Sequence, residues 1–158
     1  MSSFDSRKVA GLKRRRDVAG IIEVLETGGE RDRRAAANAL VTIPDQRAVD
    51  PLIAALRSDD WLVRTNAALA LGEFQDSRPD SPLRRIVEPL ASALLDQQPS
   101  VRAAAASALG RLRDPASIDP LISVLDDDNR AVAKTAALVL RGFDDERAKA
   151  AVASRAGT

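Results

Sequence analysis

Residues 50–56 have the sequence DPLIAAL, and the same pattern returns as EPLASAL at 88–94 and as DPLISVL at 119–125. Each copy places an acid, a proline and two leucines at fixed positions. Proline lacks an N–H that the first turn of a helix would leave unbonded, and the carboxylate before it suits the positive end of the helix dipole. Each copy therefore predicts the start of an α-helix, which we call helix A of a repeat.

A second pattern follows each copy after a short gap. Segments 63–74 and 101–112 both begin with Val-Arg and carry small or apolar residues 4, 7, 8, 9 and 11 positions after the valine. Segment 132–143 keeps the apolar frame but has Ala133 in place of the arginine and Arg141 in place of a glycine. Apolar residues at this spacing form one stripe of an α-helix, and the alanine at the fourth position allows close helix packing. We call these segments helix B.

A weaker copy precedes the other three, so the predicted repeats span residues 17–43, 48–74, 86–112 and 117–143. Its Asp32 stands where the other copies have valine, and we expect this acid to face solvent at the end of the array. Segment 75–85, with two prolines, predicts a surface loop between repeats. Segment 144–155 predicts a C-terminal capping helix, and we expect one domain over residues 1–158.

The acid-Pro-Leu pattern followed by Val-Arg, spaced alanines and Leu-Gly resembles the HEAT-like repeats of the phycobilisome bilin lyase type. The resemblance covers about residues 17–143 and departs from the pattern at Asp32, Ala133 and Arg141. It implies an all-α fold: an armadillo-like, right-handed α-solenoid of about four helical hairpins with terminal capping helices. It implies less about function, because the motif residues are those that build the core.

Composition restricts the chemistry of the chain. Its 158 residues include 24 basic and 23 acidic side chains, with no histidine and no cysteine. The near-zero net charge gives no field that would recruit nucleic acid or an anionic membrane. Without histidine or cysteine there is no usual general base and no thiolate or imidazole metal site. We therefore expect no catalytic residue, no cofactor and no metal. Because the N-terminal segment lacks the apolar block of a secretory signal, we also expect a cytoplasmic location. A monomer is the favoured oligomeric state.

Several polar features have both a structural and a functional interpretation. The acidic segments 59–60 and 126–128 are predicted to cap B helices, with metal binding as the alternative. Trp61 is predicted to pack over the turn between helices, with an interface anchor as the alternative. The basic run at 7–16 is predicted to be a solvated helix surface, and contact with an acidic protein or nucleic acid is the alternative.

Arginine recurs at one position of helix B, as Arg33, Arg64 and Arg102. The resemblance implies that this arginine links adjacent repeats through turn carbonyls or acids. Direct contact with a ligand stays open as the alternative.

The B helices of a solenoid line its concave side, so residues between the apolar stripes predict the partner-binding surface. Leu69 and Leu138 are apolar at a position where such repeats usually carry charge, and we expect both to be exposed anchors, with burial of both by tilting of the helices as the alternative. The predicted surface comprises Arg34, Asn38, Thr65, Leu69, Glu73, Ser107, Arg111, Lys134, Leu138 and Arg141.

Three classes of function follow from these observations. The first is a non-enzymatic scaffold that binds a partner protein or peptide in the concave groove. The second, implied by the resemblance, is a bilin lyase-like or chromophore-handling subunit. The third is a nucleic-acid-binding protein similar to the HEAT-like alkylpurine DNA glycosylases, against which the single tryptophan and the near-neutral charge argue.

Overall fold

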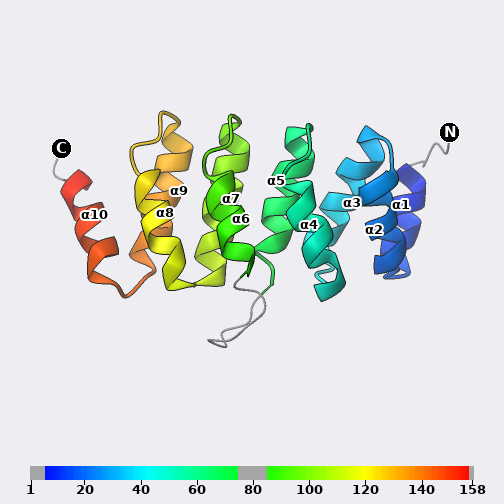
Figure 1. The fold of residues 1–158 in the computed structure, drawn as a ribbon, viewed down its shortest axis with the longest axis horizontal. Coiled ribbons are helices and arrows are strands. Elements are labelled where there is room, and N and C mark those ends of the chain that lie inside the picture. Colours follow the sequence, from blue (N-terminus) through cyan, green and yellow to red (C-terminus); the bar gives the residue numbers. More distant parts are fainter. Residues whose placement is uncertain (1–5, 75–84, 157–158) are drawn as a thin grey trace.

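A computed structural model describes residues 6–74 and 85–156 of the chain. All regular elements in these two ranges are helical, and consecutive helices pair into hairpins that stand side by side along a rod (Figure 1). The four hairpins are α2 (Val18–Thr27) with α3 (Glu30–Thr42), α4 (Val49–Ala55) with α5 (Trp61–Leu71), α6 (Val87–Ala93) with α7 (Pro99–Leu112), and α8 (Ile118–Ser123) with α9 (Arg130–Arg141). This arrangement confirms the predicted α-solenoid.

Short 3-10 turns, η1 (Gln46–Ala48) and η3 (Pro115–Ser117), lead directly into α4 and α8. The A helices α4, α6 and α8 begin one residue before the acid-Pro pair, which places that pair in the first helical turn as predicted. The predicted loop at 75–85 lies, apart from Arg85, outside the described residues.

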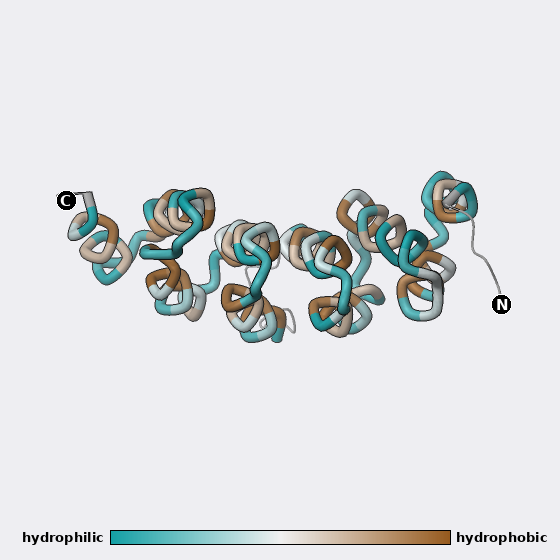
Figure 2. Tube along the Cα trace, turned by 90° about the horizontal axis from the view of Figure 1, so that it is seen from above, coloured by the Kyte–Doolittle hydropathy of each residue, from teal (hydrophilic) through white to brown (hydrophobic). Residues whose placement is uncertain are grey.

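The apolar stripes form one continuous core. Val63, Val101 and Val132, which begin the B-helix pattern, are at most 1% exposed. Seen from above, the helices form two rows, and the rod bends with its hollow side on the row that contains α3, α5, α7 and α9 (Figure 2). Consecutive helices of this row pack against each other, so the B helices lie closer together than the A helices. The hollow side is therefore the predicted concave surface.

Two glycines permit the close approach of the B helices. A Cβ on Gly72, at the end of α5, would lie 2.7 Å from the Cα of Ala108 in α7, and a Cβ on Gly110 would lie 2.7 Å from a methyl carbon of Val139 in α9. Arg141 occupies the equivalent position of α9 and is exposed, since no further B helix packs on α9 in the described structure. This explains why the last copy of the pattern departs from glycine there.

Each end of the rod carries an additional helix. Helix α1 (Ser6–Arg14) packs on α2 and α3 and buries Val9 and Leu12. Helix α10 (Glu146–Ala156) packs on α8 and α9 and buries Ala148. The expectation that Asp32 faces solvent is wrong: it is only 6% exposed, since it lies in the first turn of α3 beside Gly28 and Gly29, at the position where the other repeats bury a valine. A carboxylate in that turn suits the helix dipole.

Candidate partner-binding surface

The structure divides the ten predicted surface residues into paired and unpaired groups. Arg34 forms ion pairs with Asp60 and Glu30, so it links the first two repeats. Arg111 and Glu73 pair with each other across α7 and α5 at 2.6 Å. Thr65 donates its hydroxyl to the Trp61 carbonyl, and Ser107 is half-buried. The exposed members of the set are Asn38, Arg111, Lys134, Leu138 and Arg141, and of these only Arg111 forms an ion pair within the described residues.

The two predicted leucine anchors differ in exposure. Leu138 is 67% exposed, whereas Leu69 is half-buried and packs against the core. The expectation of an exposed leucine is therefore wrong for Leu69. The difference arises because α7 packs beside α5, while α9 has no following B helix to cover its leucine.

Exposed residues of α9 form a single stripe. Arg130, Lys134, Leu138 and Arg141 are spaced four, four and three residues apart, which places them on one face of the helix. We call these four residues the α9 stripe. Its three cations have no ion-pair partner within the described ranges, so their charge is available to a ligand. Arg130 was missed in the sequence, although its position four residues before Lys134 could have indicated it.

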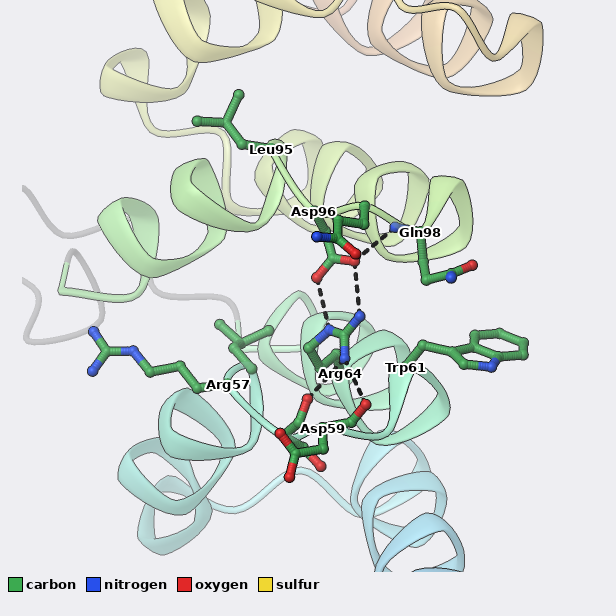
Figure 3. A pocket seen from close by; sticks show the side chains of 10 residues that line it. Arg57, Asp59, Trp61, Arg64, Leu95, Asp96 and Gln98 are labelled. Carbon is green, nitrogen blue, oxygen red and sulfur yellow. Dashed lines mark hydrogen bonds and ion pairs between the residues drawn. The ribbon is translucent and has the colours of Figure 1, made fainter.

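Two of the recurring arginines join adjacent repeats through buried ion pairs. Arg102 donates from Nε and Nη2 to the carboxylate of Asp127, both at 2.7 Å, and from Nη1 to the carbonyls of Asp96 and Gln97. Arg64 makes the same contacts with Asp96, at 2.7 and 2.9 Å, and with the carbonyls of residues 58 and 59 (Figure 3). The predicted structural role is confirmed for both. Ala133 holds this position in α9, and among the described residues no turn of a further repeat packs beside α9 to supply an aspartate.

These arginines lower the pKa of their aspartate partners. Hydrogen bonds from Arg102 lower the pKa of Asp127. Partial burial alone would raise the pKa of Asp96, but hydrogen bonds from Arg64 and from the Gln98 N–H outweigh it and lower the pKa. A lowered pKa in the folded state means that both carboxylates stabilise the fold when ionised.

We expect the protein to lose stability as the pH falls below about 4, the pKa of an aspartate in the unfolded chain. Above that pH the contribution of Asp96 and Asp127 is fully present, and it disappears as the pH falls through their lowered folded-state pKa values. Urea midpoints measured between pH 7 and pH 3 would check this. The Asp127→Asn variant should show a shallower dependence, and an identical slope in the variant would contradict the role of this carboxylate.

The acidic segments act as helix caps and ion-pair partners. The Asp60 carboxylate accepts from the Leu62 N–H at the start of α5, and the Asn129 side chain accepts from the Ala131 N–H at the start of α9. Asp126 pairs with Arg155 of α10. The predicted capping role is confirmed for Asp60. It is wrong for residues 126–128, because Asn129 is the N-cap of α9. Within residues 6–74 and 85–156 no group of acids is arranged to hold a metal ion.

Trp61 and Leu95 border an open depression of about 570 Å³ between the turns of the second and third repeats. They lie on opposite sides of the Arg64–Asp96 pair (Figure 3). Trp61 is 40% exposed, so more than half of its surface is covered, whereas Leu95 is 79% exposed. Leu95 was missed, although charged residues, Arg57 and Asp126, hold the equivalent place in the neighbouring turns.

Comparisons with known proteins address the family. The HEAT-repeat family matches the sequence twice, over residues 18–88 and 87–158. This chain is a HEAT-repeat protein. The match is to HEAT repeats in general and does not distinguish the phycobilisome lyase type. No curated protein matches the sequence.

Solved structures agree with this HEAT-repeat fold. A designed armadillo repeat protein in complex with the peptide (KR)4 is similar with a TM-score of 0.69 and 16% identity, over 98% of this chain and 76% of that one. An engineered protein from a structural genomics consortium is similar with a TM-score of 0.69 and 23% identity, over 98% and 74% of the two chains. At these identities the likeness concerns the fold alone. No helix of the described ranges has both the length and the apolar character needed to span a bilayer.

Proposed function

We propose that this HEAT-repeat protein is a non-enzymatic scaffold that binds a protein or peptide segment on its hollow side. The observation that carries the proposal is the α9 stripe, in which the 67% exposed Leu138 lies among three unpaired cations on the inner row of helices. An exposed apolar side chain bordered by charge is typical of a binding surface. A designed repeat protein of the same fold binds a peptide, which supports peptide binding as a function of this kind of scaffold.

The charge of the α9 stripe favours an acidic partner. Arg130, Lys134 and Arg141 would face the carboxylates of a bound segment, while Leu138 would contact an apolar side chain of it. Arg34 and Arg111 are already neutralised by acids of the protein itself and contribute less. We therefore propose a partner segment that is acidic and amphipathic, with Asn38, Thr65 and Ser107 as polar contacts along the groove and Leu69 and Glu73 at its border.

We expect Leu138→Asp to weaken binding of an acidic amphipathic peptide by about tenfold or more, without loss of thermal stability, because Leu138 is a solvent-exposed anchor. The measurement is fluorescence anisotropy with a labelled peptide of glutamate and leucine at helical spacing, compared with (KR)4. Leu95→Asp is the matched control, since Leu95 is also exposed, at 79% against 67% for Leu138, but lies at the turns. It should bind as the unmodified protein does.

Charge reversal tests whether the partner is acidic. Lys134→Glu combined with Arg141→Glu should shift the preference from the acidic peptide to (KR)4. The acidic-partner proposal would be overturned if the unmodified protein bound neither peptide. It would also be overturned if the Leu138→Asp variant bound the acidic peptide as tightly as the unmodified protein does.

The two other function classes stay predictions. A chromophore-handling subunit would shift the visible absorbance of added bilin. A nucleic-acid-binding protein would retain DNA with an affinity that falls steeply with salt. Both measurements use the same purified protein.

A further inference from the structure

The first junction between repeats differs from the two that follow. Arg33 is the fourth residue after the N-cap of its B helix, as are Arg64 and Arg102 in theirs. Ser58 stands where the next two turns have Asp96 and Asp127. The backbone confirms this equivalence, because the N–H two residues later donates to the side-chain oxygen in all three turns.

This difference leaves one guanidinium donor unsatisfied. The serine hydroxyl is uncharged and shorter than an aspartate, and the Nε of Arg33 is buried without a hydrogen-bond partner. Arg34 cannot replace the missing contact, since it pairs with Asp60 and Glu30. A buried donor without an acceptor is unfavourable, and a charged one more so.

Arg33 lines a cavity of about 260 Å³ between the first two repeats. The equivalent cavity at the next junction, about 210 Å³, has Asp96 at the position of Ser58 and Pro89 at that of Pro51. The first cavity also contains Arg57, which is exposed and forms no ion pair within the described ranges, and one acid, Glu26. Its charged lining is therefore two arginines against one glutamate.

We propose that this cavity binds a carboxylate group, which takes the place that an aspartate of the protein fills at the other two junctions. A carboxylate matches the paired N–H groups of an arginine side chain, as the contacts of Arg64 and Arg102 demonstrate. The apolar walls, formed by Leu25, Val63 and alanines of α4, suit a short aliphatic stem behind the carboxylate. This site lies apart from the α9 stripe, so it does not depend on the proposed function.

The direct test follows the Arg33 Nε–H signal by ¹⁵N NMR while sodium acetate is added at constant ionic strength. We expect a saturable shift of this signal and no shift of the Arg64 and Arg102 signals, whose acceptors are already in place. At ten times the dissociation constant the melting temperature should rise by about 3–5 °C. Sodium chloride is the reference, and an equal response to it would overturn the proposal.

Two variants locate the site. Ser58→Asp supplies the missing carboxylate internally, so it should raise the melting temperature and abolish the response to acetate. Arg33→Met should abolish the response as well. Arg31→Met is the matched control, because it removes an exposed arginine from the same helix and should respond as the unmodified protein does. A response that persists in both Ser58→Asp and Arg33→Met would overturn the proposal.

The source of the carboxylate is distinguished by a second titration. A short peptide with one glutamate should bind more tightly than acetate if the group belongs to a polypeptide, and equally if the site takes small carboxylates. Phosphate that displaced acetate would overturn the assignment to a carboxylate. Leu138→Asp should leave every one of these titrations unchanged, which separates this site from the peptide-binding surface.

Discussion

Replacing Gly72 by valine is expected to lower the free energy of unfolding by about 2–3 kcal/mol. A Cβ at this position meets the backbone of α7, at 2.7 Å from the Cα of Ala108, and backbone cannot move aside as a flexible side chain can. Helices α5 and α7 would have to separate at a contact where Ala68 and Ala105 are fully buried. Urea unfolding followed by circular dichroism measures the loss.

The backbone conformation of Gly72 would not by itself make a valine unfavourable at this position. Its φ of −71° and ψ of −13° are right-handed helical values that any residue adopts. The matched control is Gly11→Ala in α1, where a new Cβ would have only the end of Arg15 within 4 Å. That variant should be as stable as the parent or more stable by up to about 1 kcal/mol, from helix propensity. A Gly72→Val protein with unchanged stability would mean that the B helices do not pack this closely.

Replacing Arg102 by methionine should cost about 2–3 kcal/mol of stability, because hydrogen bonds to charged groups are among the stronger ones. The change removes both contacts to the Asp127 carboxylate, whose side chain is only 8% exposed, and both contacts to the turn carbonyls. Adding Asp127→Asn should recover part of the loss, since the carboxylate would no longer be buried without its partner.

Arg155 provides the matched control for Arg102. It also contacts an aspartate through Nε and Nη2, at 2.7 and 2.6 Å, but the two side chains are 37% and 70% exposed. Solvent and salt screen such a pair, so Arg155→Met should not shift the melting temperature measurably. Equal losses in the two variants would show that burial of the Arg102 pair does not govern its contribution.

The sequence alone indicated the helices and their buried faces, since periodicity is a local property. Val101 and Leu109 repeat at helical spacing and are buried as that spacing requires. The recurrence of Arg64 and Arg102 at one position of consecutive repeats could be seen in the sequence, and the resemblance to HEAT-like repeats implied that they link those repeats.

The exposure of individual side chains was harder to predict from the sequence, because it depends on which neighbour packs beside a given helix. Leu69 and Leu138 hold equivalent positions in their repeats. A following B helix, α7, packs beside the helix of Leu69, whereas none follows the helix of Leu138 in the described structure. The unpaired Arg33 required knowledge of the turn that faces it, since only the contact between repeats reveals that Ser58 leaves it without an acceptor.

Each B helix packs only on its neighbours in the stack, as α3 does on α5, α5 on α7 and α7 on α9. The hairpins at the ends can therefore unfold while the central hairpins stay folded. The mostly buried pairs Arg64–Asp96 and Arg102–Asp127 join the second hairpin to the third and the third to the fourth, whereas the N-terminal hairpin is joined to the second by the more exposed Arg34–Asp60 pair. Amide hydrogens of α5 and α7 should therefore exchange with deuterium most slowly, and those of α2 should exchange sooner. Uniform exchange along the stack would indicate a single all-or-none unfolding unit instead.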